Sequence, residues 1–298
     1  MLEQLDLNFL DSPETIACFL LKIPDGYALF ETGPHSTFPV LLKLLAEKGI
    51  KLEEIKHVFL THIHLDHAGA AWALAEAGAN VYVHPRGYPH LLDPSKLLDS
   101  ARRIYQDQMD YLWGQFKPIP EEQLFEVADL QSWKFGDTEV RAHYTPGHAV
   151  HHIAWQVGAD LIAGDVAGVR IGKGPVMPPC PPPDINLDHW NESIDRIREL
   201  APARVWLTHF GVVKNVETHL NELQQRLQDW ANWIYPWFEK GTAASEIVPQ
   251  FQEYVKNQLI EEGISGQELE KYEKANPAWM SVAGLLRYWY KKTNAQSK

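Results

Sequence analysis

Residues 61–69, THIHLDHAG, place three histidines and an aspartate within six positions, directly after the apolar run VFL. Such groups repel one another when they carry like charges, and they are costly to bury without a partner. A metal cation held among them would remove both costs. The fold must therefore set this loop at the end of a buried strand and bring further ligands to it. The residues concerned are His62, His64, Asp66 and His67.

Strand-like and helix-like segments alternate through the first two thirds of the chain. Apolar runs bounded by turn residues predict strands at 15–23, 27–32, 57–62, 80–85 and 203–211, and three more within 138–165. Helical patterns fall at 36–49 (with Ser36 as N-cap), 68–78, 94–116 and 188–200. This alternation predicts a layered α/β fold, in which ligand-type residues follow strand ends.

Three later motifs supply further ligand-type side chains. TPGH delivers His148 after a tight turn, AGD delivers Asp165 at a strand end, and LTHFG delivers His209 at another. A His-x-His pair can hold one ion, and the Asp66–His67 pair then faces the other way and can hold a second. Imidazole and carboxylate suit zinc, and also manganese or iron. His148 is favoured over His151 and His152, which enter a strand.

These motifs, in this order over residues 61–211, resemble those of the metallo-β-lactamase fold metallohydrolases. ETGPH is similar to the family's early Asp-Thr-Gly, with Glu31 in place of the aspartate. The resemblance points to the glyoxalase II-like and lactonase-like branch. It implies an αββα sandwich with two divalent ions, zinc foremost, between the sheet edges. Its implied ligands are His62, His64 and His148 for one ion, Asp66, His67 and His209 for the other, and Asp165 as a bridge.

The implied activity is hydrolysis of an ester, thioester or lactone. Two ions that share a water make hydroxide available near neutral pH and polarise a carbonyl oxygen. Asp66 is the predicted catalytic residue, because it can orient the hydroxide and carry its proton to the leaving group. The chain contains no GxSxG motif for a serine nucleophile.

The stretch GDVAGVRIGKG departs from two branches of the family. It lacks the tyrosine that acyl-homoserine lactonases carry after the bridging aspartate, and the aromatic residue that glyoxalase II enzymes carry there. Arg170 and Lys173 remain candidates for binding a substrate carboxylate, with an ordinary solvated loop as the alternative. His84, at a strand end, is a further candidate for lining the pocket. The aromatic segment 105–116 is either a lid or part of the core.

Two other classes of function stay open. Persulfide dioxygenases share the histidine-rich motif and bind a single iron, so the chain could be an oxidoreductase on the same scaffold. His64 argues against flavodiiron proteins, which have glutamate there. The third class is a non-catalytic binding module, against which the complete ligand set argues.

The pattern changes after Gly211, and the rest of the chain predicts helices at 217–241, 243–263 and 276–293. We expect a catalytic domain over 1–212 and a helical appendage over 213–298. Trp230, Trp233 and Trp237 share one helical face, and Pro236 should kink or end that helix. The aromatic surface is expected to pack near the active-site mouth and to contribute to a homodimer.

Composition excludes several partners. The formal net charge of −12 argues against nucleic acid. No stretch reaches the roughly 18 apolar residues needed to span a bilayer, and no signal peptide is evident. The two cysteines, Cys18 and Cys180, form no disulfide framework, and Cys180 in its proline loop is a weak candidate for a reactive thiol. The expected setting is the cytoplasm and the expected partner a small-molecule substrate.

Overall fold

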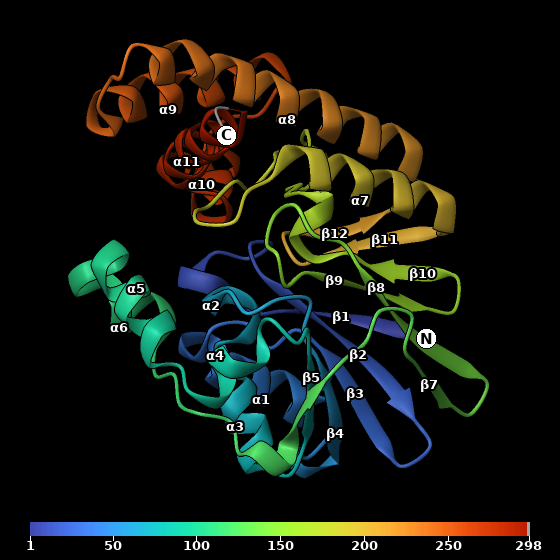
Figure 1. Ribbon diagram of the computed structural model, residues 1–298. Coiled ribbons are helices and arrows are strands. Elements are labelled where there is room, and N and C mark those ends of the chain that lie inside the picture. Colours follow the sequence, from blue (N-terminus) through green and yellow to red (C-terminus); the bar gives the residue numbers. More distant parts are fainter. Residues whose placement is uncertain (297–298) are drawn as a thin grey trace.

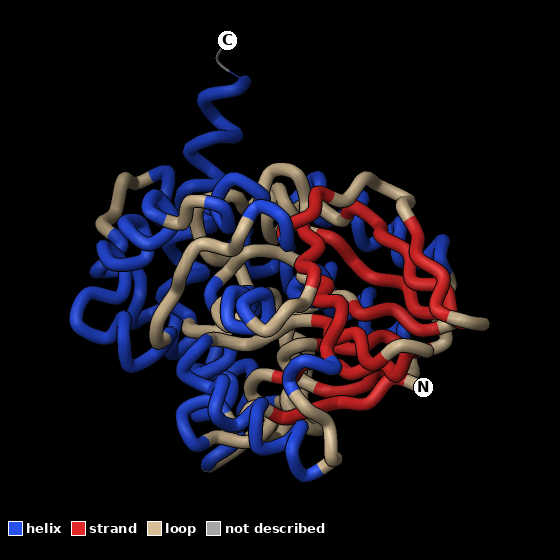
Figure 2. Tube along the Cα trace, turned by 90° about the horizontal axis from the view of Figure 1, so that it is seen from below, coloured by secondary structure: helices blue, strands red, loops and turns tan. Residues whose placement is uncertain are grey.

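The computed structural model describes residues 1–296 and places two sheets face to face with helices on both outer faces (Figure 1). This is the αββα sandwich that the resemblance implied. Viewed from below, the strands gather on one side of the molecule, and the C-terminal end of the last helix extends away from the rest (Figure 2).

The first sheet follows chain order along its six described strands. These are β1 (Leu2–Asp6), β2 (Ala17–Ile23), β3 (Gly26–Phe30), β4 (Ile55–Phe59), β5 (Asn80–Val83) and β6 (Leu124–Glu126). The strands from β1 to β3 pair antiparallel, and those from β3 to β6 pair parallel. Parallel pairs need crossover connections. The helices in these connections are α1 (Phe38–Glu47), α2 (Leu65–Ala68), α3 (Ala71–Glu76), α4 (Tyr88–Leu92), α5 (Ser95–Tyr105) and α6 (Met109–Trp113).

The second sheet runs in the reverse spatial order, from β12 to β7. Its strands are β7 (Ser132–Phe135), β8 (Thr138–Tyr144), β9 (Ile153–Val157), β10 (Asp160–Ile162), β11 (Arg204–Leu207) and β12 (Gly211–Val213). The pairing is antiparallel except between β10 and β11, which α7 (Leu187–Leu200) connects. Short 3-10 helices lie at Phe9–Asp11, His35–Thr37, Leu52–Glu54, Gln106–Gln108, Glu121–Gln123 and Gly164–Ala167.

Aromatic side chains fill the space between the sheets. The Phe59 ring lies 5.0 Å from that of Phe30 and 4.8 Å from that of Trp155, centroid to centroid. The Trp155 indole donates to the carbonyl of Leu60 at 3.0 Å, so its one polar atom is paired inside the core. Leu60 precedes His62 by two residues, so this hydrogen bond holds the loop that carries His62 and His64 against the opposite sheet.

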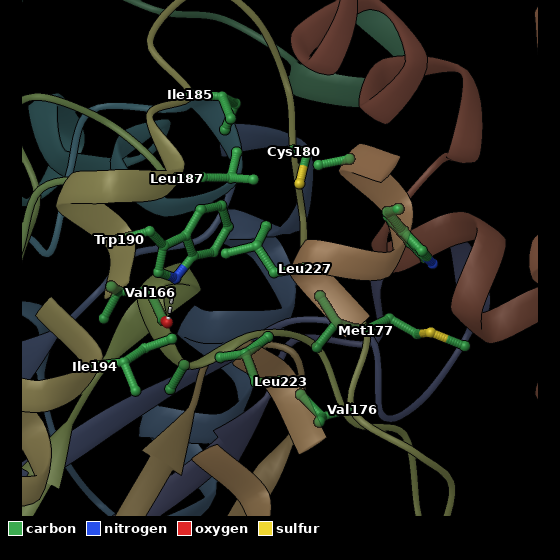
Figure 3. Packing of buried hydrophobic residues seen from close by; sticks show 14 of the residues in the cluster. Val166, Val176, Met177, Cys180, Ile185, Leu187, Trp190, Ile194, Leu223 and Leu227 are labelled. Atoms are coloured by element: carbon green, nitrogen blue, oxygen red, sulfur yellow. Dashed lines mark hydrogen bonds between the residues drawn. The ribbon is translucent and has the colours of Figure 1, made fainter. Parts of the chain in front are cut away.

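Helices α7 and α8 (Val216–Glu239) cover the outer face of the second sheet (Figure 1). Figure 3 shows Trp190 of α7 pointing into this layer, where its indole donates to the carbonyl of Val166 at 2.7 Å. Leu223 and Leu227 of α8 lie beside it in the same buried cluster. The helical C-terminal region is therefore joined to the sandwich by a shared core.

Three further helices complete this region, α9 (Ala244–Glu261), α10 (Gln267–Ala275) and α11 (Ala278–Gln296). The expected boundary between residues 212 and 213 falls inside β12, and one hydrophobic cluster contains residues from both sides of it. The division into two domains therefore stays a prediction. Helix α11 comes so close to the proline loop that a Cβ added at Gly284 would lie 1.9 Å from the carbonyl oxygen of Cys180.

Several local predictions were wrong. Ser36 does not cap α1, which begins at Phe38, but donates to the carbonyl of Leu112 at 2.6 Å. Pro236 lies inside α8, which continues to Glu239, so it does not end the helix, and the alternative of a kink stays a prediction. Asn276 ends α10 instead of opening the last helix, and its amide donates to the carbonyl of Pro178. None of the described helices has the length and apolar composition that crossing a membrane requires.

Candidate metal centre

The structure brings all seven predicted ligands together at one edge of the sandwich. They form two groups of candidate donor atoms, which are His62, His64, His148 and Asp165, and Asp66, His67 and His209. Each follows the end of a strand, namely β4, β8, β10 or β11. The turn before His148 depends on Gly147, whose φ is +142° and whose added Cβ would lie 2.4 Å from Trp190 Cα. The TPGH motif is thus a packing requirement against α7.

In the first group, three imidazole nitrogens converge. His64 Nδ1 lies 2.9 Å from His62 Nε2 and 3.0 Å from His148 Nε2. Asp165 Oδ2 lies 3.3 Å from His148 Nε2.

The second group lies beside the first. His209 Nε2 lies 3.4 Å from His67 Nε2 and 3.4 Å from Asp66 Oδ2. The other oxygen of Asp165, Oδ1, lies 3.3 Å from His67 Nε2 and 3.5 Å from His209 Nε2. The Asp165 carboxylate therefore presents one oxygen to each group.

These distances fit metal ions. Ligand atoms at roughly 2.0–2.1 Å around a tetrahedral zinc ion are about 3.3 Å apart, close to the spacings here. Asp165 Oδ1 is buried and has no hydrogen-bond partner among the described residues. A cation would use this free oxygen and the converging nitrogen lone pairs, so the donor set suits divalent metals.

Contacts behind the rings fix which nitrogen faces the centre. His148 Nδ1 lies 2.9 Å from the carbonyl of Pro179, and His209 Nδ1 lies 2.7 Å from that of Thr15. A carbonyl can only accept, so each Nδ1 carries the proton and each Nε2 keeps its lone pair. His62 Nδ1 lies 2.9 Å from Thr61 Oγ1, a hydroxyl that can donate or accept, so this contact orients the ring without fixing its tautomer.

The electrostatics differ between the two groups. Burial, and then the neighbouring histidines, lower the pKa of His62 and His64, the latter to about 3. Burial also disfavours a charged His67, but Asp165, Asp66 and Glu31 outweigh it and raise the pKa of this ring. Burial opposes ionisation of Asp66, yet His67 and His209 lower its pKa to about 2. Burial and neighbouring charges therefore favour neutral imidazole at His62 and His64 and a protonated ring at His67.

A cleft of about 510 Å³ opens over both groups. His64, Asp66, Asp165 and His209 reach its floor. One wall comes from α5 and α6, and the opposite wall from the segment Glu273–Met280, which joins α10 to α11. The tail thus lies at the mouth of the site, as expected, and the aromatic segment 105–116 contributes Tyr105 and Trp113 to the cleft.

The predicted substrate contacts lie elsewhere. Arg170 and Lys173 line a separate cavity near α8, where Arg170 Nη1 is 3.5 Å from Glu222 Oε2. His84 is buried, its ring lies 4.2 Å from that of Tyr144 at a tilted angle, and it does not line the cleft. This placement argues against substrate contact by any of the three. Cys180 is fully buried and burial raises its pKa, so its thiol is not reactive.

Sequence reasoning missed the carbonyls of Thr15 and Pro179 and the contact between Trp279 and Tyr105. A backbone carbonyl has no residue signature, so only the fold reveals the first two. Trp279 was expected to pack near the mouth, but its partner ring, Tyr105, lies 174 positions earlier in the chain at a centroid distance of 6.2 Å. No local pattern connects two such residues.

An αββα sandwich with His and Asp donors at its edge defines a class of metal-binding folds. The model of the Metallo-beta-lactamase superfamily matches residues 12–209, and the chain belongs to this superfamily, which is largely hydrolytic and metal-dependent.

The metallo-beta-lactamase fold-containing protein ST1585 of Sulfurisphaera tokodaii is 31% identical over 58% of this chain and 67% of its own length. The crystal structure of ST1585 from Sulfolobus tokodaii has a TM-score of 0.69 at 24% identity, covering 95% of this chain and 97% of that chain.

Two other relatives carry names that state a reaction. A hydroxyacylglutathione hydrolase of Thermosynechococcus vestitus is 29% identical over 66% of this chain and 65% of its own length. An atrochrysone carboxyl ACP thioesterase of Aspergillus fumigatus is 25% identical over 58% of this chain and 44% of its own length.

Proposed function

We propose that this chain is a hydrolase of an ester, thioester or lactone carbonyl that works with two divalent metal ions, zinc foremost. The observation that carries the proposal is the Asp165 carboxylate, with one oxygen directed at each donor group beneath the cleft. The proposed ligands of the two ions are the seven residues of the two donor groups. The names of the hydrolase and the thioesterase among the relatives support an acyl substrate.

When bound, such ions supply hydroxide near neutral pH and polarise a carbonyl oxygen. The protein's own part falls to Asp66. Its side chain is 23% exposed at the cleft floor, and its lowered pKa keeps it an ionised acceptor. In this proposal the Asp66 carboxylate orients a water, takes its proton and passes that proton to the leaving group.

Metal analysis together with an activity panel tests the proposal. Metal-replete protein should carry about two ions per chain and hydrolyse members of a panel of thioesters, lactones and β-lactams, and a chelator should abolish turnover. A single tightly bound iron would contradict it and favour the dioxygenase alternative. Full metal content with no turnover of any panel member would favour a binding module.

The homodimer also remains a proposal. The tail aromatics that suggested it pack within the chain, with Trp230 fully buried and Trp233 stacked on Tyr254 at 5.2 Å. Light scattering should report about twice 34.0 kDa if the dimer forms, and a clean monomer would remove the claim. A cytoplasmic setting likewise remains a prediction.

A further inference from the structure

Four aromatic rings form a continuous row along the cleft. Phe9 stacks on Trp113 at 5.7 Å, Trp113 meets Tyr105 edge-on at 5.0 Å, and Tyr105 meets Trp279 edge-on at 6.2 Å. All four line the cleft. They come from the N-terminal loop, from α5 and α6, and from α11, so three distant parts of the chain build one surface.

The middle of the row, Trp113 and Tyr105, lies beside the loop that carries the ligands His64 and Asp66. Leu65, between the ligands His64 and Asp66, belongs to the small hydrophobic cluster against which Tyr105 and Trp113 pack. The Asp66 charge also contributes to the raised pKa of Tyr105, after burial as the larger cause. A substrate whose carbonyl group is held at the two donor groups would therefore extend the rest of its molecule past the Tyr105 ring.

Charged groups are scarce along these walls. Lys274 is the one Lys or Arg among the described residues that line the cleft, and its Nζ lies 3.5 Å from the carbonyl of Leu10. Glu273 adds a carboxylate on the same wall. Arg170 and Lys173, the cations that follow the bridging aspartate, line the other cavity. Carboxylates of a substrate would find no pair of cations here, and an apolar group would be desolvated among rings.

We propose that this aromatic row binds an uncharged, apolar acyl group and selects it over charged thioesters such as those of glutathione. The inference rests on the proposed hydrolysis of an acyl substrate and names its chemical class. Rings at edge-on and stacked angles favour an aromatic or a long hydrocarbon acyl group, because the half-buried rings of Tyr105, Trp113 and Trp279 offer apolar surface to the cleft.

Binding of thioethers, which cannot be hydrolysed, tests the inference apart from catalysis. Calorimetry on zinc-loaded protein compares S-benzyl-N-acetylcysteamine, which is neutral, with S-benzylglutathione, which has the same ring on a charged tripeptide. We expect the neutral thioether to bind at least about tenfold more tightly, and its S-methyl homologue to bind more weakly still. Equal or tighter binding of the glutathione thioether would overturn the proposal.

A pair of variants on one helix adds a second test. Trp279→Ala should weaken binding of the neutral thioether about tenfold or more, since truncating a buried aromatic contact removes much of the binding free energy. Tyr290→Ala is the control, because Tyr290 is 63% exposed and lies outside the cleft. Equal affinities for the two variants would refute the role of the row. If the parent protein binds the neutral thioether but turns over no member of the substrate panel, that result would count against the proposed function and not against the aromatic row.

Discussion

Glu31 Oε1 lies 3.4 Å from His67 Nδ1, and both side chains are fully buried. Neither Glu31 oxygen has a hydrogen-bond partner among the described residues. Glu31 also adopts a φ of +63°, in the left-handed region. The His67 ring, a member of the second donor group, is thus supported from behind by a carboxylate that has no hydrogen-bond partner among the described residues.

Replacing this carboxylate should weaken the second donor group. Glu31→Gln removes the charge that favours a proton on His67 Nδ1, and with it the support that keeps Nε2 basic. We expect about a 10- to 100-fold loss of affinity for one of two ions, measured by competition with a chromophoric chelator. Glu76→Gln, on the surface of α3, is the control. Unchanged affinity for both ions would show that Glu31 does not act on the centre.

Acidification should release the ion of the second group first. The pKa of His67 is raised, so its proton competes with a metal ion at a higher pH than for an ordinary histidine. The pKa values of His62 and His64 are lowered, so these rings stay unprotonated to a lower pH. Dialysis in steps from about pH 8 to about pH 5.5, with metal content measured at each step, should show loss of one ion before the other. Simultaneous loss would contradict this order.

Asp66→Ala should cost more activity than stability. The side chain reaches the cleft floor, so its loss leaves the hydrophobic cores unchanged. We expect kcat to fall by about a hundredfold or more, while the melting temperature of the metal-free protein stays near that of the parent. An unchanged kcat at full metal content would exclude the proposed role in orienting water.

Removing the tail should prevent folding. Truncation after Gly211 deletes α8 to α11 and exposes Trp190 and the outer face of the second sheet. Each large apolar side chain exposed costs about 1.5–3 kcal/mol, and several would exceed the 5–15 kcal/mol that holds a typical domain folded. The truncated chain is therefore expected in the insoluble fraction. A soluble, active product would show that the helices are dispensable.

Two point variants check the same packing in the full chain. Leu227→Ala on α8 should lower the free energy of unfolding by about 2–5 kcal/mol, because this side chain is 1% exposed. Ile260→Ala on α9 should change it little, since Ile260 is 47% exposed. Denaturant melts of both variants provide the comparison.

The sequence predicted the candidate metal ligands better than the strands at the edges of the sheets. His62, His64, Asp66 and His67 are neighbours in the chain, and His148, Asp165 and His209 each follow an apolar strand, so local patterns locate all seven. Strands β1, β6, β7 and β12 were missed. β6 has only three residues, and β7 alternates polar Ser132 and Lys134 with Trp133 and Phe135 at a sheet edge. Such segments become strands only through the neighbours with which they pair.

Arg170 shows the other limit of sequence reasoning. Its position after Asp165 suggested a substrate contact, but the backbone turns away and the guanidinium lies beside His219 and Glu222 of α8. The partner that decides its direction lies about fifty positions later. Tyr105 belongs to the segment that was expected to be either a lid or part of the core, and it lines the cleft together with Trp279 of the tail.

The close approach of Gly284 to Cys180 ties α11 to the ligands. Cys180 follows Pro179, whose carbonyl fixes the orientation of His148. A helix beyond the region that the superfamily model matches therefore packs behind a candidate ligand inside that region. Any side chain larger than glycine at this crossing would push on the proline loop and, through it, on the imidazole. The geometry of the metal centre thus depends on the C-terminal helices. A core transferred to another protein would need α11 as well.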